Sequence, residues 1–288
     1  MHKVGDIAAL REIVRSWRAA GERVGLVPTM GNLHAGHLGL VRRAKALAPR
    51  VVVSIFVNPT QFDRRDDLAA YPRTLEHDTD LLMEADVDLL FAPNESEIYP
   101  SGTENAAFVD VPSLSGILCG ASRPGHFRGV ATVVSKLFNM VQPDLAVFGE
   151  KDCQQLAVIR RLVHGLDFPV QVFGVPTFRE GDGLAMSSRN RYLTPQERSR
   201  APALYGMLKR ISEALREGER DYAALEGDGI HELRESGFDP DYVSIRRQGD
   251  LRQPSTDDKE LVVLAAARLG AARLIDNVIV GVERSFPV

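Results

Sequence analysis

The composition of the chain is that of an ordinary globular protein. Its 288 residues are 44% hydrophobic and 26% charged, enough to build a substantial core in one large or two ordinary domains. The formal net charge of −4 argues against a nucleic-acid-binding surface, and two cysteines are too few for a disulfide framework. The first ten residues lack the apolar core of a signal peptide, and no stretch approaches the roughly 20 apolar residues of a membrane span. We therefore expect a cytoplasmic protein with no nucleic-acid or membrane partner.

Helical and strand patterns alternate through the first 176 residues. Apolar spacing predicts helices over 7–20, from His37 to about residue 47, over 74–85 and over 130–141, and apolar runs predict strands over 23–27, 51–57, 87–92, 145–148 and 170–175. A nearly continuous apolar run such as 51–57 is typical of a strand covered on both faces in a parallel sheet. The alternation predicts an α/β fold with a Rossmann-like, doubly wound parallel sheet.

The first of these strands leads into Pro28-Thr29-Met30-Gly31-Asn32-Leu33-His34-Ala35-Gly36-His37, which we interpret as a strand-to-helix turn. Its glycines permit positive φ and close approach of a ligand, and the N–H groups of a first helical turn attract phosphate. His34 and His37 are three residues apart, so both face one side of that turn and could neutralise charge on a triphosphate. The alternatives are histidines without a function and a metal-binding pair, for which no third ligand is close in sequence.

Two later strands also end in polar segments. Asn58-Pro59-Thr60-Gln61-Phe62 follows the strand over 51–57, and Gly149 to Gln155 follows the strand over 145–148. Ligands bind at such carboxyl ends in α/β sheets, and Lys151 would there be a mobile cation beside phosphates. Asp152 and Gln155 have the spacing of a helix capping box, and spacing alone favours that role for both.

The segment Gly120 to Gly129 is rich in glycine and basic residues, and we expect it to be a loop before the helix over 130–141. It could meet an anion, or be a surface connection whose arginines face water. It is not a P-loop, because His126 and Phe127 stand where that motif has Lys and Ser/Thr. No Gly-x-Gly-x-x-Gly follows a strand and no Gly-x-Ser-x-Gly or cysteine signature is present, which disfavours a dehydrogenase and covalent catalysis.

A domain boundary is predicted near residue 177, marked by Pro176 and Gly181-Asp182-Gly183. Beyond it, Met186-Ser187-Ser188-Arg189 is rich in hydrogen-bond donors, and Thr194 to Glu197 has the N-cap, proline and glutamate of a helix start. We expect one long helix from there, a second over 222–235, and strands over 242–245, 261–266 and 274–280. Residues 177–288 are thus predicted to form a smaller α+β domain, and residues 1–176 the larger one.

The chain resembles the pantoate-β-alanine ligase (pantothenate synthetase) family, which belongs to the nucleotidyltransferase superfamily marked by His-x-Gly-His. His34-Ala35-Gly36-His37 carries that motif, and the likeness covers nearly the whole chain, most specifically at 28–37, 53–59, 61–62, 71–74, 120–129, 149–152 and 186–189. The resemblance implies a cytoplasmic homodimer that uses ATP and Mg²⁺ to join (R)-pantoate to β-alanine. It also implies a Rossmann-like domain over 1–176 that binds nucleotide and pantoate, and a smaller lid domain over 177–288.

The resemblance further implies a reaction in two steps. The pantoate carboxylate attacks the α-phosphorus of ATP and releases pyrophosphate, and the β-alanine amine then attacks the pantoyl adenylate and releases AMP. Catalysis is assigned to His37, as proton donor or phosphate stabiliser, to His34 beside it and to Lys151. Gln61 and Gln155 are the implied pantoate contacts, which for Gln155 replaces the capping role. The implied ATP contacts are Met30, Gly31, Asn32, Leu33, His34, Ala35, Gly36, His37, Gly149, Glu150, Lys151, Asp152, Phe178, Met186, Ser187, Ser188 and Arg189.

Three further expectations concern the metal, a loop and one departure from the family. Mg²⁺ should bridge the ATP phosphates with few protein ligands, so its ligands are not assigned, and Asp78 is only a weak candidate. The segment Met186 to Arg189, the counterpart of a flexible loop in related adenylating enzymes, is expected to close over ATP as a lid. The family has an aromatic residue where this chain has Cys153, which affects the packing of that helix and not the chemistry.

Two rival functions are compatible with the same residues. Another nucleotidyltransferase of the superfamily would retain the nucleotide in its product, so release of free AMP would exclude it. A nucleotide-binding regulatory module would show no turnover, since a fold with phosphate-binding turns does not by itself prove catalysis.

Overall fold

The computed structural model describes residues 1–63 and 65–281, which form two compact units. The first unit contains Met1–Glu150 and Val158–Pro176. The second contains Lys151–Ala157 together with residues 177–281. Residues 151–157, which follow a strand of the first unit, therefore pack with the C-terminal residues. The single boundary predicted near residue 177 does not account for this.

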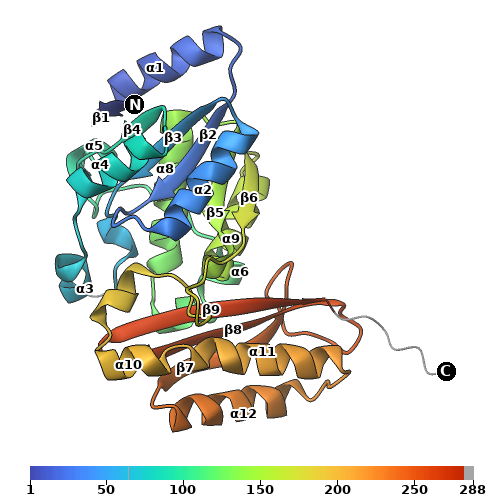
Figure 1. Ribbon diagram of the computed structural model, residues 1–288. Helices are drawn as coiled ribbons and strands as arrows, with labels where there is room; N and C mark the ends of the chain where they lie inside the picture. The colour runs from blue at the N-terminus through green and yellow to red at the C-terminus, as the bar shows by residue number, and fades with distance from the viewer. Residues whose placement is uncertain (64, 282–288) are drawn as a thin grey trace. The chain divides into compact units, whose positions relative to one another are not determined.

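The first unit is built on a six-stranded sheet in the order β1-β4-β3-β2-β5-β6, and all of its strand pairs are parallel (Figure 1). The strands are β1 His2–Val4, β2 Val24–Thr29, β3 Arg50–Ile55, β4 Leu89–Phe91, β5 Leu145–Gly149 and β6 Gln171–Val175. From β2 the chain proceeds through β3 and β4 towards one edge, whereas β5 and β6 lie on the other side of β2. The strand order therefore reverses between β2 and β5, and the Rossmann-like, doubly wound prediction is confirmed.

Helices cover both faces of this sheet because its central strands are apolar on both sides. Val51, Val52 and Val53 of β3 are all fully buried. Figure 1 shows α2 in front of the sheet and α8 behind it. The helices up to this sheet's last strand, 3₁₀ turns included, are α1 Ile7–Ala19, α2 Ala35–Leu47, η1 Pro59–Gln61, α3 Arg65–Ala70, α4 Leu75–Glu84, α5 Glu95–Ile98, α6 Pro112–Ser115, α7 Cys119–Ser122, α8 His126–Val141, η2 Glu150–Asp152 and α9 Cys153–Gly165. The last two of these lie partly in the second unit.

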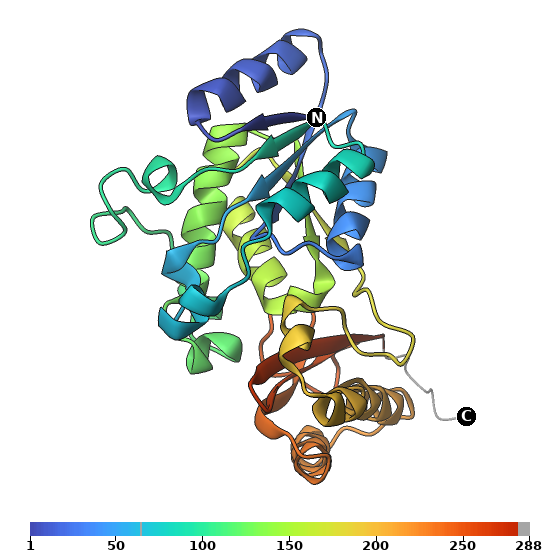
Figure 2. The same cartoon turned by 60° about the vertical axis from the view of Figure 1, so that its left-hand side comes forward.

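The segment Gly120 to Gly129 is not a loop, and that prediction was wrong. It comprises most of α7 and the first turn of α8, separated by a bend. Its glycines serve close packing: a Cβ on Gly129 would lie 2.4 Å from the carbonyl oxygen of Thr60, and one on Gly120 would lie 2.0 Å from that of Ser115. The irregular stretch of this unit is instead residues 99–111, which loop outward from the sheet in Figure 2.

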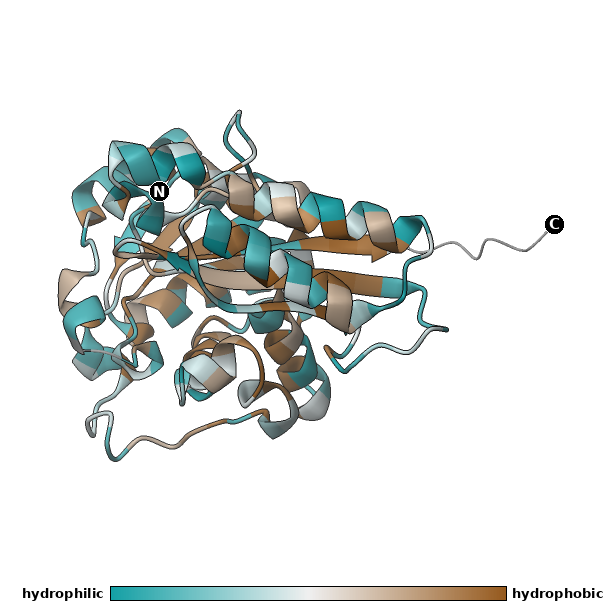
Figure 3. Ribbon diagram, turned by 90° about the horizontal axis from the view of Figure 1, so that it is seen from below, coloured by the Kyte–Doolittle hydropathy of each residue, from teal (hydrophilic) through white to brown (hydrophobic). Residues whose placement is uncertain are grey.

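The second unit is an antiparallel three-stranded sheet in the order β7-β8-β9, with helices packed on it. Its elements are η3 Ser188–Tyr192, α10 Pro195–Arg200, α11 Ala203–Arg216, α12 Tyr222–Glu235, β7 Asp239–Arg247, β8 Glu260–Leu269 and β9 Ala272–Gly281. In Figure 3 its long strands are mostly brown, whereas the helices beside them alternate brown and teal, as amphipathic helices over an apolar sheet do. The smaller α+β fold is confirmed.

The long helix predicted in this unit is divided into two helices. The capping box of Thr194 and Glu197 forms as expected, but α10 ends at Arg200 and α11 begins at Ala203. Pro202 lies between them, and proline has no N–H to continue the helical hydrogen bonds. None of the described helices, in either unit, has both the length and the hydropathy that a membrane crossing requires.

Candidate active site

The predicted strand-to-helix turn lies at the carboxyl end of β2, beside the point where the strand order reverses. β2 ends at Thr29 and α2 begins at Ala35, so Met30 to His34 form the connection. Gly31 and Asn32 both have left-handed backbone, with φ of +80° and +51°. This is the position at which α/β sheets bind ligands, and the first turn of α2 directs its N–H groups there.

His34 and His37 form the N-terminal cap of α2. The Nδ1 atom of His34 accepts the N–H of Gly36 at 3.2 Å, and the Nδ1 atom of His37 accepts the N–H of His34 at 3.3 Å. This is a capping box made by two imidazoles, whose ring centroids are 4.1 Å apart. Because each Nδ1 accepts a backbone N–H, a neutral ring must carry its proton on Nε2. Both side chains therefore present Nε2 as a donor, as stabilisation of phosphate oxygens requires.

A second group of polar side chains follows β3, where Gln61 lies on η1. Gln61 is buried, and its Nε2 donates to the sulfur of Met30 at 2.9 Å, which joins two predicted site residues of different segments. Its Oε1 accepts from the Nδ2 of Asn58 at 3.1 Å, and the hydroxyl of Tyr99 donates to the Oδ1 of Asn58 at 2.8 Å. These bonds fix Gln61 with its N–H₂ end towards Met30. Asn58 and Tyr99 were not predicted as site residues, although Asn58 directly ends the apolar run of β3.

Arg123 and His126, from the glycine-rich segment, also contact Gln61. The Nδ1 atom of His126 lies 2.7 Å from the carbonyl oxygen of Gln61, and a guanidinium nitrogen of Arg123 donates to the same oxygen at 3.3 Å. Arg123 also forms an ion pair with Asp63 at 3.1 Å. Arg123 is not a surface arginine that faces water, because its side chain is only 14% exposed and it holds the backbone that carries Gln61.

In the second unit, Lys151, Phe178 and Met186 come together. The Nζ atom of Lys151 donates to the carbonyl oxygen of Met186 at 2.8 Å, and the N–H of Met186 donates to the carbonyl oxygen of Phe178 at 2.9 Å. The backbone of Lys151 is held by β9, because the Nδ2 atom of Asn277 donates to its carbonyl oxygen at 2.9 Å. Three predicted nucleotide contacts that are far apart in sequence thus share one hydrogen-bonded cluster.

An ion pair between Arg179 and Asp276 lies next to this cluster. Two guanidinium nitrogens of Arg179 donate to the two carboxylate oxygens of Asp276, at 2.6 and 2.9 Å. Burial raises the pKa of Asp276, and the bonds from Arg179 oppose that rise. Arg179 also lies over the ring of Tyr205, 3.6 Å from its centroid. Neither member of the pair was predicted, because no motif connects residues 97 positions apart.

The other predicted residues have local roles in the structure. Ser187 precedes η3, and its hydroxyl accepts the N–H of Arg189 at 3.2 Å, so residues 187–189 start a helical turn. Gly149 ends β5, Glu150 follows it, and Asp152 directly precedes α9, in whose first turn Gln155 lies. The structure thus brings His34, His37, Met30 and Gln61 together in the first unit, and Lys151, Phe178 and Met186 in the second.

The surroundings of Lys151 set the pH at which it loses its charge. Burial lowers its pKa from the ordinary 10.5, Asp152 and Asp276 oppose the lowering, and Arg189 and Arg179 add to it. If the ammonium group binds phosphate, the KM for ATP must rise with pH as the group deprotonates, at a lower pH than for an ordinary lysine.

Lys151→Arg should remove this rise, because a guanidinium group stays protonated to a pKa of about 12 or above. The measurement is the KM for ATP of both proteins between about pH 7 and about pH 10, with the exposed Lys209→Arg as control. Lys209→Arg should keep the wild-type profile. Parallel profiles for wild type and Lys151→Arg would show that Lys151 does not bind the nucleotide in its charged form.

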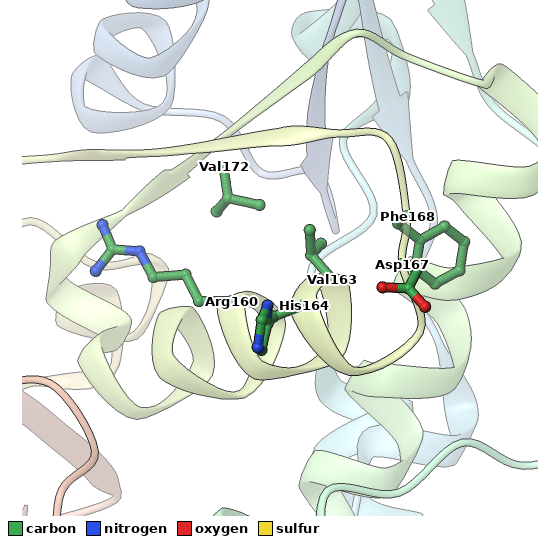
Figure 4. A pocket seen from close by; sticks show the side chains of 6 residues that line it. All are labelled: Arg160, Val163, His164, Asp167, Phe168 and Val172. Carbon is green, nitrogen blue, oxygen red and sulfur yellow. The ribbon is translucent and has the colours of Figure 1, made fainter.

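A surface hollow elsewhere in the first unit contains none of the predicted site residues. It lies between α9 and β6, as Figure 4 shows, and is lined by Arg160, Val163, His164, Asp167, Phe168 and Val172. His164 and Arg160 are exposed on the surface of α9. The hollow is therefore separate from the residues that follow the carboxyl ends of β2 and β3.

Within residues 1–63 and 65–281, no three His, Cys, Asp or Glu side chains are grouped to hold a metal ion. Mg²⁺ commonly keeps several waters and takes one or two carboxylates plus substrate phosphates. Asp78, the weak candidate, is fully buried and directs both carboxylate oxygens at backbone N–H groups.

The chain is similar to known proteins over nearly its whole length. The family model described as pantoate-β-alanine ligase matches residues 2–279. A pantothenate synthetase of Methylococcus capsulatus is 58% identical over 283 residues, which cover 98% of this chain and 99% of the relative. The crystal structure of pantothenate synthetase from Thermus thermophilus superposes with a TM-score of 0.88 at 49% identity, covering 96% of this chain and 99% of the other.

A third similar protein was solved with ligands. It is the pantoate-β-alanine ligase of Francisella tularensis, in complex with β-γ ATP and β-alanine. Its TM-score is 0.81 at 34% identity, and the match covers 97% of each chain.

Proposed function

Because the chain belongs to the pantoate-β-alanine ligase family, we propose that it condenses (R)-pantoate with β-alanine at the expense of ATP, through a pantoyl adenylate. The observation that carries the proposal is the pair of imidazoles at the start of α2. His34 and His37 present Nε2 at the carboxyl end of β2, where the strand order reverses. An anionic ligand at this position would meet two side-chain donors beside the positive end of the α2 helix dipole.

In the first step, an oxygen of the pantoate carboxylate attacks the α-phosphorus of ATP. The bond from that phosphorus to the bridging oxygen of the β-phosphate breaks, and pyrophosphate leaves. Little covalent chemistry is asked of the protein, so positioning and stabilisation of phosphate charge dominate. We assign the stabilisation of phosphate charge to Met30 through His37, with His37 as the main donor and His34 beside it.

Gln61 is proposed to bind pantoate. Its amide is oriented by Asn58, so that its N–H₂ end faces Met30 and is the end that a substrate oxygen would meet. A neutral amide can hold a carboxylate or hydroxyl without stabilising its charge enough to weaken its attack. Gln155 is proposed as a second pantoate contact on the strength of the family resemblance.

Lys151 is proposed to bind phosphates of ATP. Gly149, Glu150, Asp152 and the segment Met186 to Arg189 are proposed as further nucleotide contacts, and Phe178 as a contact of adenine. The clustering of Lys151, Met186 and Phe178 supports this assignment. In the second step the β-alanine amine attacks the acyl carbon of the adenylate, the acyl–oxygen bond breaks, AMP leaves and the amine loses a proton.

The family resemblance supplies three further parts of the proposal. They are the use of Mg²⁺, a homodimeric state and a cytoplasmic location. Mg²⁺ would add positive charge at the phosphates when bound. Removal of the metal with a chelator should stop pyrophosphate release, and sedimentation should give twice the mass of the 31.7 kDa chain. Activity that persists in excess chelator would exclude a requirement for Mg²⁺. A monomer at the concentration used in the assay would exclude the homodimer.

The decisive experiment follows ¹⁸O from the carboxylate of pantoate. With ATP and Mg²⁺, pyrophosphate should form only when pantoate is present, and after β-alanine is added the label should appear in AMP. ADP and phosphate as products would exclude an adenylate. Nucleotide retained in the product, with no free AMP, would favour the rival nucleotidyltransferase, and the absence of any turnover would favour the regulatory module.

A further inference from the structure

Asp78, on the first turn of α4, reaches the turn that precedes α2. Its Oδ2 accepts the N–H of Asn32 at 2.8 Å and its Oδ1 accepts the N–H of Leu33 at 2.8 Å. The hydroxyl of Thr74 donates to Oδ2 at 3.1 Å. The Asp78 side chain is fully buried, and it is 45 residues away in sequence from Leu33. One carboxylate thus binds two successive backbone N–H groups of the turn.

The turn that Asp78 holds has an unusual backbone. Gly31 and Asn32 lie one after the other in the left-handed region, which costs free energy for any residue that has a Cβ. A Cβ on Gly31 would lie 3.0 Å from Oδ2 of Asp78 and 3.1 Å from Cγ2 of Ile55. The carboxylate therefore packs directly against the turn and supplies the acceptors that two of its N–H groups need.

We propose that Asp78 is the positioning residue of the phosphate-binding turn: it fixes the backbone of Asn32 and Leu33 and thereby sets where His34 and His37 present their donors. His34 follows Leu33 directly, and its backbone N–H and imidazole form the capping box with His37. The proposal rests on the proposed function, in which this turn binds ATP. It gives Asp78 a role distinct from that of a magnesium ligand.

The chemistry of a carboxylate is essential to this role. An ionised carboxylate only accepts hydrogen bonds, so both of its oxygens can face N–H groups. An asparagine at position 78 would turn an N–H₂ group towards one of the two donors, and one backbone N–H would lose its acceptor. Displacements of about 1 Å at a reacting group cost about 10²-fold in rate.

The test compares Asp78→Asn with two control variants. We expect Asp78→Asn to lower kcat for pantoate-dependent pyrophosphate release by about 10²-fold, while the Kd of pantoate changes by less than about threefold. Asp80→Asn makes the same chemical change two residues further along α4 at an exposed position, and should match wild type. Thr74→Val removes only the third bond to the carboxylate, so its loss of kcat should be the smaller one.

Two further measurements separate positioning from metal binding and from misfolding. Amide hydrogen exchange should accelerate at Asn32 and Leu33 in Asp78→Asn, with the rest of the sheet unchanged, and this readout does not depend on activity. The loss of kcat should persist at saturating Mg²⁺. Recovery of kcat at high Mg²⁺, or unchanged exchange at Asn32 and Leu33, would overturn the proposal. Failure of wild type to release pyrophosphate would instead overturn the proposed function.

Discussion

Replacing His37 with alanine should slow the pantoate-dependent release of pyrophosphate by about 10²- to 10³-fold, the usual cost of losing one preorganised donor to a developing anion. The donor is Nε2, because Nδ1 accepts the N–H of His34. Single-turnover measurement of pyrophosphate after mixing with ATP, Mg²⁺ and pantoate gives the rate of this step directly. Adenylation at the wild-type rate would remove His37 from the mechanism.

The same substitution also removes half of a helix cap, so a second variant has to separate structure from chemistry. Glutamine is a preferred residue at this position of a capping box, since its side chain can reach back to the backbone N–H at the N-cap. His37→Gln should therefore retain the thermal stability of the wild type and still lose the rate. His164→Ala, at an exposed histidine of α9, is the control for a histidine outside the site. Full activity in His37→Gln would mean that the imidazole itself is not required, because the glutamine amide supplies both the cap and an N–H donor.

Replacing Arg179 with methionine should lower the free energy of unfolding by about 3–5 kcal/mol, because the buried carboxylate of Asp276 loses both charge-assisted hydrogen bonds from the guanidinium group. The Asp276 side chain is only 2% exposed, so water cannot replace the two bonds from Arg179. Urea unfolding, followed by a probe in the second unit, measures the loss.

Two comparisons test the cause of that loss. Arg198 pairs with Glu180 and Asp182 at the surface, where its side chain is 32% exposed, so Arg198→Met should cost about 0–1 kcal/mol. The double variant Arg179→Met with Asp276→Asn removes the stranded charge and should regain much of the stability lost by Arg179→Met alone. Equal losses for Arg179→Met and Arg198→Met would show that burial of Asp276 is not what makes the first pair important.

The regular elements could be predicted because their patterns are long and local. The apolar residues of α8 repeat with helical spacing from Val130 to Val141, and α12 spans the predicted residues 222–235. The context of the histidine turn was also predictable, since a buried strand precedes it and an amphipathic helix follows it. β1 was missed because a three-residue edge strand, mostly exposed, carries no periodic signal.

What could not be predicted depends on pairs of residues that are far apart in the chain. In the sequence Asp78 looks like one more solvated acid on a helix, and its contacts with Asn32 and Leu33 are what distinguish it from Asp80. Asp276 lies in an apolar strand pattern that gives no hint of Arg179. The prediction of a loop over Gly120 to Gly129 was wrong because glycine is used both in turns and where two backbones pack closely. The sequence alone does not show which other segment packs against a glycine.

The bond from Asn277 to the carbonyl oxygen of Lys151 has a consequence for synthesis of the chain. Its two residues are 126 positions apart, and Asn277 lies on β9, at the end of the described residues. During translation Lys151 leaves the ribosome long before its partner exists. The hydrogen bond that holds the backbone of Lys151, the proposed phosphate-binding lysine, can therefore form only after residue 277 has been made. A product terminated before that residue could fold its parallel sheet and still lack this part of the proposed nucleotide site.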